Sequence, residues 1–123
     1  MTNSAPDEAR EHRIAMEVVV DAYGPEEQAM GWYSYLEDTL TFPFKARCIQ
    51  ARALSPLREG EEVVIDRLAP ADDCLHEIFV LATWQERSLG LPLAQLAAVE
   101  ADEDTVEAIA DWHYWVKQGY SFG

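Results

Sequence analysis

The acidic excess of this chain is concentrated at its two ends. The formal net charge is −14, but residues 42–99 contribute only −2, from six basic and eight acidic side chains. Residues 1–41 contribute −7 and residues 100–123 contribute −5. Hydrophobic periodicity changes at the same two boundaries, so charge and periodicity divide the chain into three consecutive parts.

The middle part has the periodicity of a small β-sheet. Apolar and polar side chains alternate from Phe44 onward, and turn-forming residues separate the later apolar runs. Residues 84–87 are predicted to form a tight hairpin turn, and residues 92–96 a single helical turn. The five predicted strands are residues 44–54, 63–65, 78–83, 88–91 and 97–99. We expect them to form a small SH3-like antiparallel β-barrel over about 44–99.

The N-terminal part is predicted to be helical over about 7–40. A first helix covers about 7–22, although its valine-rich end could equally form a strand. Pro25 suits the first position of a second helix, which must end by Pro43. The residues of this second helix that are predicted to face the core are Ala29, Tyr33, Leu36 and Leu40.

The C-terminal part is predicted to form one helix over about 103–118, with Asp102 as its N-cap and Gly119 as its terminator. Helical spacing predicts a core-facing side made of Val106, Ile109, Ala110, His113 and Val116. An acidic stripe falls on one face of the same helix, which is typical of a solvated surface. Its members are Asp104, Glu107 and Asp111. The predicted fold class is therefore α+β, a small barrel flanked by N-terminal and C-terminal helices.

Size and composition limit the classes of protein to consider. The length of 123 residues predicts one domain, residues 1–123, and the 49% apolar content excludes a disordered acidic chain. The net negative charge opposes binding to nucleic acid and to anionic membranes, because both require basic residues. The longest apolar run, residues 78–84, is too short to span a membrane, and the N-terminus lacks signal-peptide features. We therefore expect a cytoplasmic protein.

Enzymatic and zinc-binding functions find little support. The sequence contains no glycine-rich phosphate loop, no Gly-x-Ser-x-Gly turn and no His-Glu-x-x-His helix, so we expect no enzyme. A carboxylate pair for acid–base chemistry stays open as an alternative. A zinc site can also be drawn, but structural zinc sites usually contain two close pairs of ligands, and the cysteines fit ordinary core residues. The residues of that alternative site are Cys48, Cys74, His76 and His113.

An excess of carboxylates is what a calcium ion requires. Ca²⁺ takes six to eight oxygen ligands in a flexible geometry, from carboxylates, backbone carbonyls and water. The segment that begins at Asp102 does not form an EF-hand, because Glu107 occupies the glycine position and His113 replaces the bidentate glutamate. Any calcium site must therefore gather ligands from separate elements.

Seven acidic residues are the candidate calcium ligands: Asp21, Glu37, Asp38, Asp72, Asp73, Glu77 and Asp111. Glu37 and Asp38 lie at the C-terminal end of a predicted helix, where carboxylates are unfavourable unless a cation is present. Asp72, Asp73 and Glu77 lie in or just after a predicted loop, where paired aspartates also commonly form turns.

Short motifs along the chain resemble those of a known family. The longer motifs are Val19-Val20-Asp21-Ala22-Tyr23-Gly24, Ala29-Met30-Gly31-Trp32-Tyr33, Tyr35-Leu36-Glu37-Asp38, Phe42-Pro43-Phe44, Pro92-Leu93-Ala94-Gln95-Leu96 and Asp111-Trp112-His113-Tyr114-Trp115. The tripeptide Ser55-Pro56-Leu57 and the single residues Cys48, Gly60 and Cys74 continue the resemblance. As a set covering about residues 14–120, they resemble the CcbP-type calcium-binding proteins, which are small acidic bacterial proteins.

The resemblance implies a cytoplasmic calcium-binding protein without an EF-hand, which acts as a calcium buffer or sequestering protein and has no catalytic activity. The acidic positions inside or beside the matching motifs carry over as ligands, with Asp38 first among them; the others are Asp21, Glu37, Glu77 and Asp111. From the residues alone, the alternative is an SH3-like interaction module that docks a basic protein partner.

Overall fold

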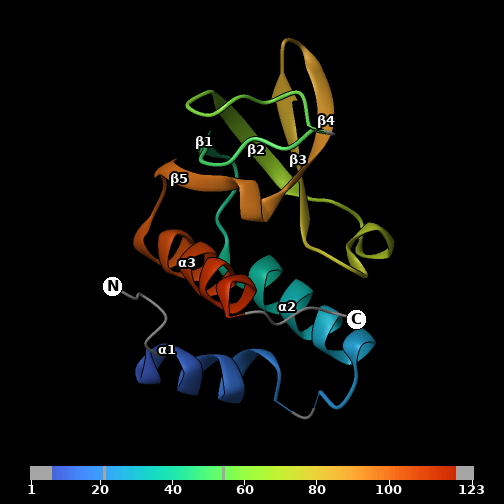
Figure 1. The fold of residues 1–123 in the computed structure, drawn as a ribbon, viewed down its shortest axis with the longest axis vertical. Helices are drawn as coiled ribbons and strands as arrows, with labels where there is room; N and C mark the ends of the chain where they lie inside the picture. The colour runs from blue at the N-terminus through green and yellow to red at the C-terminus, as the bar shows by residue number, and fades with distance from the viewer. Residues whose placement is uncertain (1–6, 21, 54, 119–123) are drawn as a thin grey trace.

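The computed structural model describes residues 7–20, 22–53 and 55–118, which form an α+β fold (Figure 1). A single five-stranded sheet occupies one half of the molecule, and the helices occupy the other half. Helices α2 (Pro25–Thr39) and α3 (Glu103–Lys117) lie between the sheet and α1 (Glu8–Arg13). No helix among the described residues is both long and apolar enough to cross a membrane.

The sheet is antiparallel throughout, and its strands are ordered β4-β3-β2-β1-β5. The strands are β1 (Phe44–Cys48), β2 (Glu62–Leu68), β3 (Phe79–Trp84), β4 (Arg87–Pro92) and β5 (Leu96–Glu100). Within the described ranges no pairing joins β4 to β5, so the sheet is open and the predicted barrel is not confirmed. The α+β class and the five strands are confirmed.

Two turns follow their predicted form. Gln85 and Glu86 have φ angles of 53° and 65° and connect the paired residues Trp84 and Arg87, as a two-residue hairpin requires. Residues Leu93–Gln95 form the short 3-10 turn η3 between β4 and β5. The first strand is shorter than predicted: β1 ends at Cys48, and the chain returns beside that residue at Gly60, whose N–H donates to the Cys48 carbonyl.

The N-terminal helical segment ends earlier than its predicted limit. α1 continues directly into η1 (Ile14–Val18), one wider turn of π-helix, so the described valine-rich end is not a strand. α2 begins with Pro25 at its first position and ends when Leu40 becomes extended. Ala29, Leu36 and Leu40 are buried as predicted.

The core lies between the sheet and the helices, and a group of three buried tryptophans joins α2 to α3. The ring of Trp32 on α2 lies 5.0 Å from that of Trp112 and 5.5 Å from that of Trp115, measured between centroids, and both of the latter belong to α3. Aromatic rings at these separations add contact energy to the apolar area that they bury. This contact holds the two helices side by side.

The predicted core-facing side of α3 is only partly correct: Ile109 is buried, and Ala110 and His113 are half-buried. Val106 and Val116 are exposed, at 45% and 37%, whereas Trp112 and Trp115 are buried. The two tryptophans carry far more apolar area than the valines, so the helix turns their side toward the core.

The predicted N-cap of α3 is confirmed, since the Asp102 carboxylate accepts from the Thr105 N–H at 2.8 Å. The predicted terminator, Gly119, lies outside the described residues.

The same rotation buries Asp111, which the sequence had predicted to be solvated. Its side chain has no exposed surface. Oδ1 accepts from Arg10 and Arg13 at 2.6 Å each, while Oδ2 accepts from Arg13 Nε at 3.1 Å and from the Tyr35 hydroxyl at 2.7 Å. Hydrogen bonding to Asp111 raises the pKa of Arg13, and burial followed by the same carboxylate raises the pKa of Tyr35. The prediction that Asp111 is solvated is therefore wrong.

These ion pairs attach α1 to the rest of the protein. None of the side chains of α1 is buried, so the helix itself contributes no fully buried apolar contact. Arg10 also bonds Glu107 at 2.8 Å, and Tyr114 donates to Glu11 at 2.6 Å. α1 is thus held on α3 by charged and polar contacts, while Ile14 and Val18 of η1 supply the buried apolar anchors that follow.

Gly31 allows η1 to lie directly against α2. A Cβ atom at this position would lie 2.3 Å from the backbone carbonyl oxygen of Val18. Real side-chain carbons do not approach backbone oxygen so closely, so the two segments can contact here only because residue 31 has no side chain.

We predict that Gly31→Ala destabilises the protein by about 1–3 kcal/mol, because the overpacking exceeds the gain in helix propensity. Urea unfolding measures the change. Gly90→Ala is the control, because its added Cβ would meet no atom closer than 4.0 Å. Equal stability of Gly31→Ala and the unaltered protein would contradict the close contact.

We predict that Asp111→Asn lowers the free energy of unfolding by about 2–4 kcal/mol, because it leaves two guanidinium groups facing a neutral amide. The control, Glu107→Gln, removes a carboxylate that is 50% exposed and should cost less than about 1 kcal/mol. Denaturant unfolding of both variants tests this difference. Similar losses for the two variants would show that Asp111 is not the main anchor of α1.

His113 gives the fold a dependence on pH. Burial is the largest influence on its imidazole and lowers its pKa below 6.5, against the opposing effect of the hydrogen bond between Nε2 and the Leu96 carbonyl at 2.6 Å. The unfolded chain therefore takes up this proton first as the pH falls, and the associated stability is lost below about pH 6.5. We predict that unfolding free energy falls less between pH 7.5 and pH 5.5 in His113→Gln than in the unaltered protein. An identical fall in both would contradict this assignment.

Candidate metal centre

The C-terminal end of α2 carries two unneutralised carboxylates. Glu37 and Asp38 are both exposed, and the last turn of the helix contains no basic residue. Within the described part of the chain, no basic nitrogen lies within 4.0 Å of either carboxylate. The unpaired carbonyl groups of a helix end add partial negative charge at the same place. A hard cation would relieve both sources of repulsion.

A hollow of about 400 Å³ adjoins Glu37. The residues that line it are Tyr33, Glu37, Phe42, Arg67, Leu68 and Pro70. The Tyr33 hydroxyl donates to the Ala69 carbonyl at 2.7 Å, and burial, followed by the charge of Glu37, raises the pKa of that phenol. Glu37 is therefore close enough to Tyr33 to influence it, and its carboxylate forms one wall of an accessible space.

Asp72 and Asp73 lie on a neighbouring element. They belong to the 3-10 turn η2 (Ala71–Cys74), which packs against α2, and both are exposed. The turn is fixed by burial of Cys74, whose sulfur accepts from the Phe79 N–H at 3.4 Å. The two aspartates thus lie near α2, although they do not converge with its carboxylates into one compact cluster.

Two of the other predicted ligands are already engaged by arginine, and one is not described. Glu77 forms a two-point contact with Arg52, at 3.1 and 2.7 Å, and the carboxylate of Asp111 is bound by Arg10 and Arg13. A carboxylate that is already paired with a guanidinium is a poorer site for a metal ion, because the cation must first be displaced. Asp21 lies outside the described residues.

The described residues contain no group of three or more His, Cys, Asp or Glu side chains that could hold a metal ion. They therefore do not bring the residues of the alternative zinc site together. Cys48 and Cys74 are both buried free cysteines, as expected of core residues. Glu37 and Asp38 fit a calcium ion best, because they offer accessible oxygen atoms, have no cationic partner and lie at the negative end of a helix.

Arg10 and Arg13, which neutralise Asp111, are the important charged residues that the sequence analysis missed. Their three-residue spacing places both on one side of α1, and they are the only two Lys or Arg residues in the first 41 positions. That isolation in an acidic segment was a usable signal for a buried acidic partner. Their partner, Asp111, lies about a hundred residues away, so spacing could not identify it.

Comparison with known proteins agrees with this architecture. A family model described as calcium binding, that of the CcbP proteins, matches residues 12–116. The crystal structure of Anabaena CcbP is 41% identical in sequence, covers 98% of each chain and has a TM-score of 0.86. A second solved structure, a calcium-binding protein in the calcium-binding form, is also 41% identical over 98% of each chain, with a TM-score of 0.80.

A comparison with curated proteins gave no match. The family model spans most of the chain, and the two solved structures match nearly all of it at an identity that implies common ancestry. The resemblance inferred from the motifs is therefore confirmed. The chain belongs to the CcbP family of calcium-binding proteins.

Proposed function

We propose that this protein binds Ca²⁺ reversibly and that Glu37 and Asp38, at the end of α2, supply carboxylate ligands. The observation that carries the proposal is the unneutralised pair of acids at a helix end that contains no basic residue. A relative that is 41% identical has been solved in a calcium-binding form, which supports Ca²⁺ as the ion. Asp72 and Asp73, on the adjoining turn, are further candidates.

The geometry favours Ca²⁺ over Mg²⁺. Glu37 and Asp38 at the end of α2 and Asp72 and Asp73 on η2 are all exposed, so the ion would complete its shell with water and backbone carbonyl groups. Ca²⁺ tolerates such irregular shells of six to eight oxygens, whereas Mg²⁺ demands a tight octahedron and retains its water.

We further propose that the protein acts in the cytoplasm as a calcium buffer or sequestering protein. A net charge of −14 penalises the compact state, and a bound divalent ion would relieve part of that repulsion. Binding would therefore be linked to stability rather than to catalysis. The same charge makes nucleic acid and anionic membranes unfavourable partners, and we expect neither to bind.

We predict saturable calcium binding by titration calorimetry at physiological salt with excess Mg²⁺ present. Asp38→Asn should weaken the affinity by about tenfold, since it removes one charged oxygen ligand. Asp104→Asn is the matched control, because it removes the same charge from an exposed position in the first turn of α3. Its effect should stay below about twofold, as expected of a screened surface charge.

The same titration distinguishes a specific site from the general acidity of the chain. Binding that disappears at physiological salt, or that both variants weaken equally, would overturn the proposed site. Thermal unfolding gives an independent measurement, because calcium at a hundredfold excess over Kd should stabilise the protein by about 2.7 kcal/mol. An unchanged Tm in saturating calcium would contradict the proposal.

A further inference from the structure

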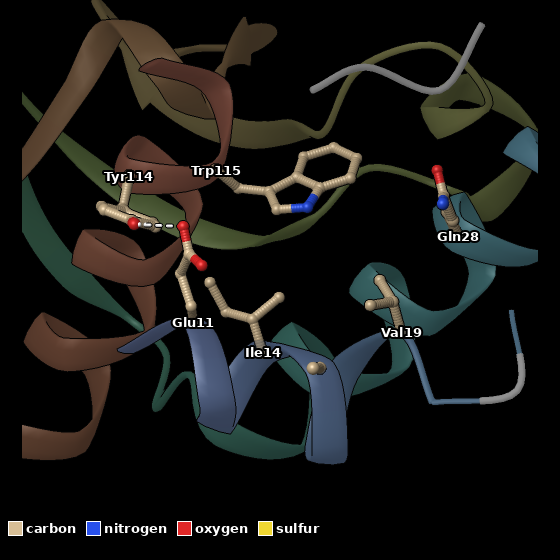
Figure 2. Close-up of a pocket in the computed structure, with 7 residues that line it drawn as sticks. Glu11, Ile14, Val19, Gln28, Tyr114 and Trp115 are labelled. Atoms are coloured by element: carbon tan, nitrogen blue, oxygen red, sulfur yellow. Dashed lines mark hydrogen bonds between the residues drawn. The ribbon is translucent and has the colours of Figure 1, made fainter. Parts of the chain in front are cut away.

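A second hollow, which shares no lining residue with the one beside Glu37, lies among the helices (Figure 2). Its volume is about 240 Å³, which suits a small ligand rather than a large cofactor. Residues from α1, η1, α2 and α3 contribute to it, together with Val19. The lining residues are Glu11, Ile14, Ala15, Val19, Gln28, Tyr114 and Trp115.

Glu11 is the acid of α1 that lines the hollow, and it has no cationic partner among the described residues. Asp7, Glu107 and Asp111 all pair with Arg10 or Arg13. Glu11 is half-buried, yet no basic nitrogen of the described residues lies within 4.0 Å of its carboxylate. A carboxylate that lines a largely apolar hollow with no basic group beside it favours a cation supplied from outside the chain.

A hydrogen bond fixes the position of this carboxylate. The Tyr114 hydroxyl accepts the Asp7 N–H at 3.0 Å and donates its proton to Glu11 Oε2 at 2.6 Å. The hydroxyl has only one proton, so this arrangement commits it to Glu11. Oε1 remains available to accept from a ligand, and the carboxylate is held in place before the ligand arrives.

Apolar side chains separate Glu11 from a second polar group. In Figure 2, Ile14, Val19 and the indole ring of Trp115 lie between Glu11 on one side and the amide of Gln28 on the other. A ligand that spans the hollow must therefore be cationic at one end, apolar in its middle and able to form a hydrogen bond at the other end, where the Gln28 amide offers both an acceptor oxygen and a donor NH2.

We propose that this hollow binds a linear alkylammonium ligand, of which an α,ω-diamine is the best match. One ammonium group bonds Glu11, and the methylene chain lies along Ile14, Val19 and Trp115. The second ammonium donates to the side-chain oxygen of Gln28. Charge-assisted hydrogen bonds of this kind are roughly twice as strong as neutral ones, and the apolar walls add the burial of the methylene groups.

A calcium ion would fit this hollow poorly. Ca²⁺ needs six to eight oxygen atoms, and the hollow offers one carboxylate, one phenol and one amide among mainly apolar walls. An organic cation gains from those walls, whereas a hydrated metal ion does not. The inference is therefore independent of the calcium site proposed at the end of α2.

The test is titration of 1,5-diaminopentane into the intact protein by calorimetry, at physiological salt and with saturating Ca²⁺. We expect one saturable site. Glu11→Gln keeps an acceptor for Tyr114 but removes the charge, and it should weaken binding by about tenfold. Glu8→Gln, which removes the same charge from an exposed position on α1 outside the hollow, should change it by less than about twofold.

Two further measurements guard against indirect effects. Ala15→Leu places a larger apolar side chain at the hollow without changing charge, and it should also weaken binding if the hollow is the site. Pentylamine, which lacks the second ammonium, should bind several-fold more weakly than the diamine. Absence of saturable binding, equal effects of Glu8→Gln and Glu11→Gln, or unaltered binding by Ala15→Leu would each overturn the proposal.

Discussion

The ion pairs that two arginines form with the buried carboxylate of Asp111 determine how the helical half of this protein is assembled. Asp111 lies on the side of α3 that faces the protein interior, with no exposed side-chain surface, and it could not be buried there as an unpaired charge. Arg10 and Arg13 neutralise it from α1, and the Tyr35 hydroxyl from α2 completes its hydrogen bonds. One side chain therefore ties three helices together. Because α1 has no buried side chain of its own, these ion pairs, together with the buried Ile14 and Val18 of η1, position the segment that helps to form the Figure 2 hollow.

The distribution of basic residues explains which acidic side chains remain available to bind a cation from outside the chain. The chain has 9 Lys and Arg for 23 Asp and Glu, so most carboxylates cannot have a basic partner. Two of those bases are committed to Asp111, Arg52 pairs with Glu77, and Lys45 and Arg47 pair with Glu62 on the sheet. Glu37, Asp38 and Glu11 are among the many described acids that have no such partner, and they differ from one another in their surroundings. The first two lie at a helix end exposed to solvent, where a metal ion can reach them, and Glu11 lies beside apolar walls that suit an organic cation.

Much of the candidate site could be predicted from local sequence, and the errors have a common cause. The choice of Glu37 and Asp38 as candidate ligands follows from two local features: the helix that begins at Pro25, and the absence of a basic residue near the end of that helix. Asp111 was assigned to a solvated face because acidic residues repeat around it with helical spacing. An acidic residue with this spacing is not solvated when basic residues from a distant segment pair with it, as Arg10 and Arg13 pair with Asp111. Glu77 is a candidate because it lies just after a predicted loop, and local sequence does not reveal that the fold places Arg52 beside it.

The sequence by itself determined the three-part division of the chain, the helix starts at Pro25 and Asp102, the hairpin at Gln85 and Glu86, and the family. These features depend on caps, turn conformations and periodicity within short segments, which neighbouring residues control. Only the tertiary structure decided that the sheet is open within the described residues, which side of α3 is buried and which carboxylates are neutralised. Those outcomes depend on packing and charge pairing between segments far apart in the chain, where the bulk of Trp112 and Trp115 outweighs local spacing.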